Sequence, residues 1–221
     1  MIHRAIEERI HNALAKKKAV TIMGPRQVGK STLADAIIPK DARILEINGD
    51  STDVQTMFIN VDEAKMKVLI GNKNFLFVDE AQKIENVGNM LKIVAEKFKD
   101  VKIIVTGSSA FKLAEAVNES LTGRKREFRL YPLSFKEMAD ETSTLEESRM
   151  IDHRLIYGYY PEVVTSPGDE KEVLKELIDS YLYKDVMEEN NIAKPDKLVK
   201  LVQALAFQIG STVSANELAG L

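Results

Sequence analysis

The chain has 221 residues, of which 44% are hydrophobic, and this is enough to bury a sizeable core in one large domain or two small ones. Its formal net charge of -3 means that the chain as a whole lacks the positive charge that drives non-specific binding of nucleic acids. It has no cysteine and only three histidines, which excludes disulfides, thiolate metal sites and a cysteine nucleophile and leaves little for a zinc site.

The first predicted element is an amphipathic helix over residues 2–14. Ile2, Ile6 and Ile10 recur on one helical face, opposite charged side chains. Charged residues interrupt this segment too often for the apolar stretch of a signal peptide, and no run elsewhere approaches the length of a transmembrane helix. We therefore expect a soluble, cytoplasmic protein that makes no membrane contact.

A strand, a loop and a helix follow in that order. The apolar run Ala19–Met23 precedes residues 24–31, which read Gly-Pro-Arg-Gln-Val-Gly-Lys-Ser, and a helical pattern then continues until Pro39. Residues 24–31, called the phosphate loop below, form a complete G-x-x-x-x-G-K-[ST] motif in the context that this motif requires. A chance match of its four fixed positions is expected in roughly one chain in a hundred of this length. The flanking strand and helix make a chance match rarer still.

Each fixed residue type of the phosphate loop has a chemical role in binding a nucleotide. Gly24 and Gly29 suit positions where backbone N–H groups converge on phosphate oxygens, because a Cβ would block the approach or because φ is positive. Lys30 is expected to reach the β- and γ-phosphates of ATP, and the Ser31 hydroxyl is expected to coordinate Mg²⁺ at the positively polarised start of the helix. The predicted nucleotide-binding residues are Gly24, Pro25, Arg26, Gln27, Val28, Gly29, Lys30, Ser31 and Thr32.

Strands continue to alternate with helices after the phosphate loop. This alternation is typical of a parallel sheet covered by helices on both faces, and therefore of an α/β fold. Further strands are predicted over residues 42–47, 75–78, 102–105 and 127–130, with a helix over 87–98.

Two carboxylates follow the strand predicted at 75–78. The run Phe-Leu-Phe-Val-Asp-Glu ends in Asp79 and Glu80, the arrangement called Walker B. Asp79 is expected to hold Mg²⁺ through water together with Ser31, and Glu80 is expected to polarise the attacking water. An apolar run with an acidic end is weak evidence alone, but here a phosphate loop precedes it with room for one further strand and helix. That spacing suits ATPases that use an additional catalytic glutamate.

The strand predicted at 102–105 runs into Thr-Gly-Ser-Ser. If this strand lies between the strand of the phosphate loop and the strand before Asp79, then Thr106 or Ser108 can sense the γ-phosphate or the attacking water. The alternative is a Gly-Ser turn in which Ser108 or Ser109 caps a helix over 111–117. Both can hold, with different residues.

Two arginines are candidates for neutralising the charge that develops during phosphoryl transfer. Arg26 belongs to the phosphate loop, and Arg124 lies in the run Thr-Gly-Arg-Lys-Arg. The basic cluster around Arg124 is equally well explained as a solvated edge strand.

The second part of the chain has a helical pattern. It begins at Ser134 and is broken by Gly158, by Pro161 and by a turn at 166–169. The sequence therefore predicts three domains: a P-loop ATPase core over 1–133, a helical lid over 134–194 and an incomplete winged-helix or helix-turn-helix segment over 195–221.

The last of these segments is predicted from two helices. One is expected over 198–209, with Gly210 as its stop, and residues 214–217 have the pattern of a capping box that opens another. Two helices joined by a short turn with glycine are similar to the first half of a helix-turn-helix or winged-helix domain, although a hairpin of a helical bundle fits the spacing equally well. Because the sequence stops soon after the second helix begins, we expect a fragment that ends inside the winged helix.

Together these motifs resemble an AAA-type ATPase of the AAA+ superfamily. The resemblance is to the prokaryotic group in which the P-loop domain is followed by a helical lid, a winged helix and often a nuclease-like domain. The matching stretches are residues 24–32, 77–83, 105–109, 121–124, 130–135 and 157–163.

The resemblance implies which residues would act on ATP. It implies that Arg124 contributes either within the chain or from a neighbouring subunit. It also implies that ATP and Mg²⁺ are the cofactors. The implied catalytic set is Glu80, Lys30, Thr106 and Arg124, and the implied metal ligands are Ser31 and Asp79.

The favoured hypothesis is Mg²⁺-dependent ATP hydrolysis, in which ATP binding closes the lid and hydrolysis reopens it. The alternatives are an ATP-binding switch or a DNA-binding regulator without turnover and, less favoured, a P-loop kinase. DNA contact through a complete winged helix, assembly into a homo-oligomer and the identity of a protein partner are left open by the sequence.

Overall fold

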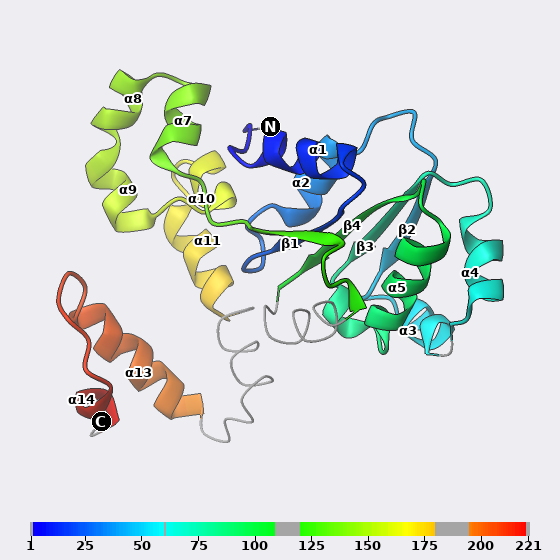
Figure 1. Ribbon diagram of the computed structural model, residues 1–221. Coiled ribbons are helices and arrows are strands. Elements are labelled where there is room, and N and C mark those ends of the chain that lie inside the picture. Colours follow the sequence, from blue (N-terminus) through cyan, green and yellow to red (C-terminus); the bar gives the residue numbers. More distant parts are fainter. Residues whose placement is uncertain (1, 60, 109–119, 180–194, 220–221) are drawn as a thin grey trace. The chain divides into compact units, whose positions relative to one another are not determined.

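The computed structural model describes residues 2–59, 61–108, 120–179 and 195–219 (Figure 1). The chain divides after Thr165 into two compact units. This division does not coincide with the boundaries expected after residues 133 and 194, and the three-domain scheme stays a prediction.

The first unit is built on five parallel strands in the order β2-β3-β4-β1-β5. Every neighbouring pair runs parallel, and β4 lies between β1 and β3. The predicted parallel α/β sheet is thus confirmed, each predicted strand being present within two residues of its expected bounds. The strands are β1 (Ala19–Met23), β2 (Ile44–Asn48), β3 (Phe75–Asp79), β4 (Lys102–Gly107) and β5 (Lys125–Arg129).

Helices cover both faces of this sheet. Along β4 the side chain of Ile104 belongs to one apolar cluster, whereas Ile103 and Val105 belong to the other, because successive side chains of a strand point to opposite faces. Burial on both faces explains why the strands read as continuous apolar runs. One face is covered by α1 (Glu7–Ala15) and α2 (Lys30–Ile37), and the other by α3 (Thr52–Phe58), α4 (Glu63–Ile70) and α5 (Val87–Lys97).

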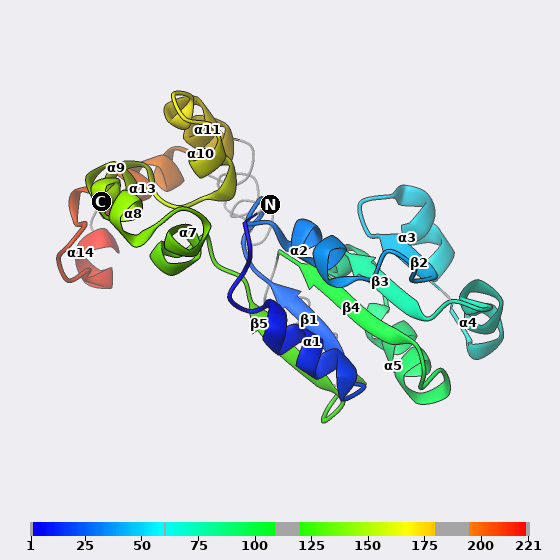
Figure 2. The same cartoon turned by 90° about the horizontal axis from the view of Figure 1, so that it is seen from above.

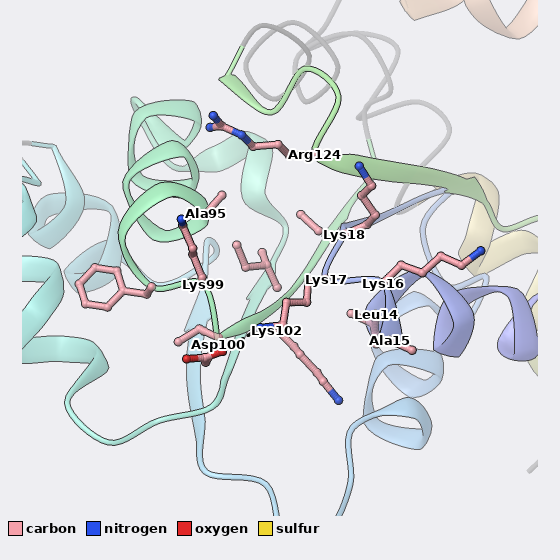
Figure 3. Close-up of a pocket in the computed structure, with 14 residues that line it drawn as sticks. Leu14, Ala15, Lys16, Lys17, Lys18, Ala95, Lys99, Asp100, Lys102 and Arg124 are labelled. Atoms are coloured by element: carbon pink, nitrogen blue, oxygen red, sulfur yellow. Dashed lines mark hydrogen bonds and ion pairs between the residues drawn. The ribbon is translucent and has the colours of Figure 1, made fainter.

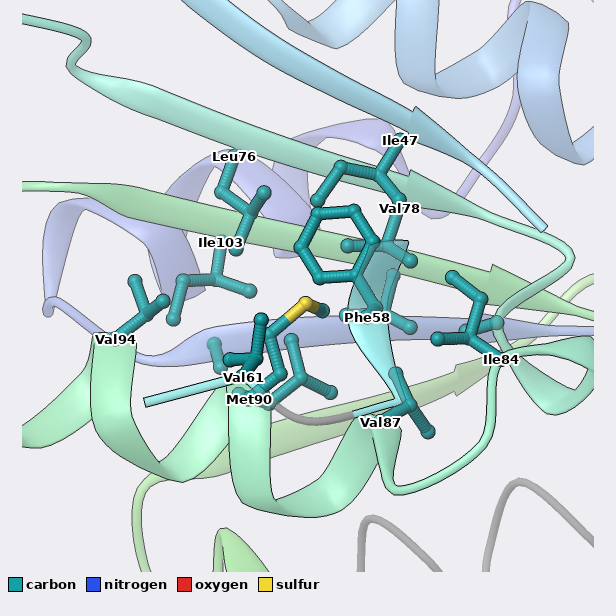
Figure 4. Packing of buried hydrophobic residues seen from close by; sticks show 14 of the residues in the cluster. Ile47, Phe58, Val61, Leu76, Val78, Ile84, Val87, Met90, Val94 and Ile103 are labelled. Atoms are coloured by element: carbon teal, nitrogen blue, oxygen red, sulfur yellow. The ribbon is translucent and has the colours of Figure 1, made fainter. Parts of the chain in front are cut away.

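Figure 4 shows from close by the apolar cluster that contains Ile103 and Val105. Met90 and Val94 of α5 pack there against Ile103 of β4, and all three side chains are at most 3% exposed. Figure 2 shows α1 running alongside β1 and β5 on the opposite face, where Ile10 is fully buried. Both faces of the strands are therefore packed, and the phosphate loop and Asp79 lie at their carboxyl ends.

The helix predicted over 2–14 is shorter than expected. It begins at Glu7, and side chains bind the backbone of the segment before it. The Arg4 N–H donates to a Glu7 carboxylate oxygen at 2.7 Å, and the Ala5 N–H donates to Glu137 at 2.8 Å.

Short helices follow β5 within the first unit. Ser134 and Glu137 form a capping box at the start of the first of them. Gly158, at φ +78°, ends the third, and the fourth begins at Pro161, so the predicted breaks at these two residues are confirmed. These helices are α7 (Phe135–Glu141), α8 (Thr144–Arg149), α9 (Ile151–Tyr157) and α10 (Pro161–Thr165).

The second unit is helical in its described part. Its longest described helix ends at Phe207, three residues before Gly210, the predicted stop, which has φ +83°. The winged helix itself is not confirmed and stays a prediction. Among the described residues we find no helix with the length and apolar character that a membrane crossing requires. The helices are α11 (Glu170–Leu177), α13 (Pro195–Phe207) and α14 (Ala215–Ala219).

A buried ion pair anchors the segment before α1. The Arg4 side chain is 8% exposed, and its Nε donates to Glu137 Oε1 at 3.1 Å. Its two terminal nitrogens donate to the carbonyl oxygens of Val28, at 3.0 Å, and Tyr131, at 2.6 Å. One side chain therefore joins the phosphate loop, the exit of β5 and α7. We call this arrangement the Arg4 clamp.

The carboxyl group of Glu137 is ionised in this arrangement. Burial raises its pKa, but the N–H groups of Ala5 and Ser134 and the Arg4 guanidinium outweigh burial and bring the pKa below its ordinary value of 4.5. A carboxylate whose pKa is lowered by folding stabilises the folded state at any pH above its unfolded pKa.

We predict that Glu137→Gln lowers the free energy of unfolding by about 3 kcal/mol at pH 7, because it leaves the buried Arg4 guanidinium without its anion. The difference from the native chain should shrink as the pH falls through the lowered pKa of Glu137. Urea unfolding across this pH range measures it. Lys136→Gln, at an exposed neighbour on α7, should change stability little, and a Glu137 effect that does not vary with pH would contradict the assignment.

Candidate active site

The phosphate loop connects β1 to α2 at the carboxyl edge of the sheet. Gly29 has φ +93°, which favours glycine, and a Cβ on Gly24 would lie 2.2 Å from the carbonyl oxygen of Leu130. Gly29 is therefore needed for its positive φ, and Gly24 because a Cβ there would collide with a neighbouring group. That neighbouring group is the backbone after β5, whereas the expected one was a phosphate. The nine predicted nucleotide-binding residues all lie on this loop and the first turn of α2.

Lys30 is buried at the start of α2, with a side chain 4% exposed. Its ammonium donates to the carbonyl oxygens of Gly24, at 3.1 Å, and Pro25, at 2.9 Å. It also lies 3.8 Å from Glu80 Oε1. A fixed positive charge thus sits between the phosphate loop and a carboxylate.

Ser31 and Asp79 are in direct contact. The Ser31 hydroxyl donates to Asp79 Oδ2 at 2.8 Å, which brings the start of α2 to the end of β3. Hydroxyl and carboxylate oxygens are donors that Mg²⁺ accepts, together with water and phosphate. The two residues predicted to hold the metal therefore lie together, and their chemistry fits Mg²⁺.

Thr106 lies at the end of β4, the central strand between β1 and β3. Its side chain is fully buried, its hydroxyl donates to Asp79 Oδ1, and it accepts from the Glu80 N–H at 3.4 Å. The strand order on which the sensor hypothesis depends is thus present. Thr106 orients the Asp79 carboxylate, and a role for it in sensing phosphate stays a prediction.

Glu80 has an unusual backbone and a restrained side chain. Its φ of +46° is uncommon for a residue other than glycine, and such conformations cluster at functional sites. Glu80 Oε2 accepts hydrogen bonds from Gln82 Nε2, at 2.5 Å, and Ser108 Oγ, at 3.1 Å. A Cβ on Gly49 would lie 2.3 Å from the Glu80 carbonyl oxygen, so neighbouring backbone limits movement as well.

The side chains that hold Glu80 Oε2 belong to Ser108, which the sequence suggested, and to Gln82, which it did not. Ser108 binds Glu80, whereas the helix that it or Ser109 was expected to cap lies outside the described residues. Gln82 was not singled out from the sequence. Only its position two residues after Glu80, on the turn η1 (Ala81–Lys83), could have suggested it.

The structure does not bring Arg124 to this site. Arg124 precedes β5 at the amino edge of the sheet, where its carbonyl accepts from the Ala19 N–H at 2.9 Å and its Nη1 pairs with Glu96 of α5 at 2.6 Å. The length of β1, about 16 Å at ~3.3 Å per residue, separates it from the phosphate loop. A contribution of Arg124 from a neighbouring subunit stays a prediction. Arg26, the other candidate, is half-buried within the phosphate loop.

A hollow of about 340 Å³ lies beside the phosphate loop. It is bounded by the segment before α1, by the first turns of α2 and by the start of α10, and apolar side chains make up much of its wall. Pro161 belongs to the Tyr-Gly-Tyr-Tyr-Pro stretch, which the resemblance matched. Its lining includes Ile2, Arg4, Gly29, Thr32, Leu33, Leu133 and Pro161.

Comparison with known proteins identifies the family. A family model described as an AAA domain matches residues 16–139, more than half of the chain. The chain belongs to this AAA domain family. A second model, for a domain of unknown function, matches residues 148–221.

The relatives are themselves uncharacterized. A protein of Methanocaldococcus jannaschii is 27% identical over 235 residues, covering 99% of this chain and 53% of its own length. A protein of Haemophilus influenzae is 28% identical over 151 residues, covering 66% of this chain and 38% of its own. The chain therefore spans about half of these relatives or less.

A solved structure shows the same fold. It is a STAND-type signal transduction ATPase with a tetratricopeptide-repeat sensor from Pyrococcus horikoshii, with TM-score 0.50 and 14% identity, covering 74% of this chain and 29% of that one. The sheet has the P-loop NTPase fold, and together with the AAA domain this indicates a nucleotide-binding protein.

We predict that Thr106→Val, which keeps the side-chain shape but removes the hydroxyl, costs about 1–2 kcal/mol of stability, because Asp79 loses a buried donor. It should also raise the Mg²⁺ concentration needed for nucleotide binding, since the Asp79 carboxylate is no longer oriented. Urea unfolding and a Mg²⁺ titration of ATP binding measure the two effects. Thr106→Ser keeps the hydroxyl and is the control, and equal behaviour of the two variants would refute the role.

Proposed function

We propose that this AAA domain protein binds Mg²⁺-ATP at the phosphate loop and hydrolyses it. The observation that supports this most directly is the convergence of Lys30, Asp79 and Glu80 at the carboxyl edge of the sheet. A cation, a metal-binding carboxylate and a second carboxylate are the groups that phosphoryl transfer to water requires.

In the proposed reaction a water oxygen attacks the γ-phosphorus of ATP and the bond from that phosphorus to the bridging oxygen breaks, giving ADP and inorganic phosphate. Glu80 accepts the proton of the water. Lys30 neutralises charge on the β- and γ-phosphates, and bound Mg²⁺, held by Ser31 and Asp79, would add to this neutralisation.

Gln82 and Ser108 are proposed to position Glu80 for this task. Both donate to Glu80 Oε2, and Oε1 is the oxygen closer to the Lys30 ammonium. One oxygen is therefore held while the other faces the phosphate loop, where the γ-phosphate of ATP would lie.

The hollow beside the phosphate loop is proposed to hold the base of the nucleotide. Its apolar wall suits an aromatic ring, and Gly29 and Thr32 connect it directly to the phosphate site. Because Leu133 and Pro161 also line it, a bound base would contact the helices after β5. This supports the proposal that ATP binding moves a lid over 134–194 against a core over 1–133.

Further assignments rest on the sequence pattern and on the resemblance. We propose that residues 195–221 begin a winged helix, that DNA contact would need its complete form, and that the protein works in the cytoplasm. In a homo-oligomer, Arg124 of one subunit would complete the site of the next.

A switch that binds ATP without turnover is the second candidate. The position of Arg124, at the opposite edge of the sheet, favours it, because within one chain Arg124 is then too far from the phosphate loop to neutralise charge on the phosphates. The restrained Glu80 beside Asp79 favours hydrolysis, and it weighs against a kinase, which transfers phosphate to an acceptor other than water.

We predict that Lys30→Ala abolishes detectable ATP binding, because the phosphate charge loses its buried partner. Glu80→Gln should keep ATP bound and lower phosphate release at least about 100-fold, the usual range for loss of a general base. Calorimetric titration with Mg²⁺-ATP and a phosphate-release assay measure the two properties.

Glu85→Gln is a matched control at an exposed position, and it should leave both properties unchanged. Unchanged turnover in Glu80→Gln would refute the catalytic assignment. Tight binding by the native chain without any turnover would favour the switch.

A further inference from the structure

A second hollow lies at the amino edge of the sheet, opposite the phosphate loop. We call it the basic hollow; it has a volume of about 290 Å³. Figure 3 shows its charged side chains arriving from the end of α1, from the turn after α5 and from the residue before β5. Its basic residues are Lys16, Lys17, Lys18, Lys99, Lys102 and Arg124, and Asp100 is its one acidic residue.

The charges of the basic hollow are only partly compensated. Lys17 pairs with Asp100 at 2.9 Å, and Arg124 pairs with Glu96. Lys18 donates to the Gly123 carbonyl oxygen at 2.5 Å, and the Lys102 ammonium lies 5.3 Å from the centre of the Phe75 ring. Lys16 and Lys99 are exposed, and neither has an ion-pair partner among the residues that the structure describes. A chain with net charge -3 therefore concentrates uncompensated positive charge in one place.

Compensation of helix dipoles does not account for this concentration. The carboxyl ends of α1 and α5 both meet the basic hollow, and each carries roughly half a negative charge. About one cation would offset both ends. Four basic side chains of the lining remain outside the two ion pairs, which is more than the helix ends require, and the surplus suits an anion from outside the chain.

We propose that the basic hollow binds the phosphate backbone of a nucleic acid without reading its sequence. Lysine ammonium groups are suited to phosphates as point charges, and regularly repeated phosphates are the partner that several exposed lysines can contact at once. The lining has no asparagine or glutamine to pair with base edges, and the Arg124 guanidinium is engaged with Glu96.

The concave shape favours a nucleic-acid strand over a lipid surface. Leu14, Ala95 and Phe98 lie among the lysines in the lining, so the charges surround a recess. A flat bilayer would reach only the rim of this recess. Within one chain the length of β1 separates the basic hollow from the proposed ATPase site, and the hollow lies outside the segment predicted to be a winged helix.

The test is Lys16→Ala combined with Lys99→Ala. The probe is a fluorescently labelled DNA duplex of mixed sequence, with a second duplex of scrambled sequence, followed by anisotropy between about 50 and 200 mM salt. Native chain should bind both duplexes equally and more weakly as salt rises. The double variant should bind about tenfold more weakly at low salt, with a slope of log affinity against log salt smaller by about two.

The control is Lys136→Ala combined with Lys171→Ala, which removes the same charge at exposed positions that are not part of the lining of the basic hollow. It should bind duplex like the native chain, and both double variants should unfold at the native temperature and release phosphate at the native rate.

Several results would overturn the proposal. They are absence of duplex binding by the native chain at low salt, native affinity in the Lys16 and Lys99 variant, and an equal loss in the control. Binding to phosphatidylserine vesicles without binding to DNA would assign the basic hollow to a lipid surface instead. Loss of ATP turnover with duplex binding intact would refute only the proposed ATPase.

Discussion

The Asp79 carboxylate is the group on which the site depends. It accepts one hydrogen bond from Ser31, at the start of α2, and another from Thr106, at the end of β4. The three strands run parallel, with β4 between β1 and β3, so the start of α2 and the ends of β3 and β4 meet at one edge of the sheet. This sheet order places Thr106 between the phosphate loop and the residues that follow β3, where it can bind Asp79.

Local sequence patterns were sufficient for the strands and for the phosphate loop. Strand and helix periodicity depend on neighbouring residues, and positive φ at Gly29 follows from the motif. Local patterns could not predict contacts between residues that are far apart in the sequence. The Arg4–Glu137 pair spans 133 residues, and it binds the segment before α1, where a helix was expected.

The position of Arg124 shows a different limit. Resemblance placed it in the catalytic set, but the residue before a parallel strand must lie at the amino edge, away from a phosphate loop that follows its own strand. The pattern Ser-x-x-Glu at 214–217 predicts the start of a helix, and α14 does begin at Ala215. The same pattern at Ser134 and Glu137 forms a capping box at the start of α7.

The Arg4 clamp limits the order in which the protein can fold during synthesis on the ribosome. β1 and its phosphate loop are synthesised early, yet β4 and β5, which flank β1, and Glu137, which holds Arg4, all emerge much later. The loop therefore cannot acquire its final shape until the chain through α7 has left the exit tunnel. A nascent chain shorter than this would expose the phosphate loop and an unpaired strand edge, the kind of surface that chaperones recognise.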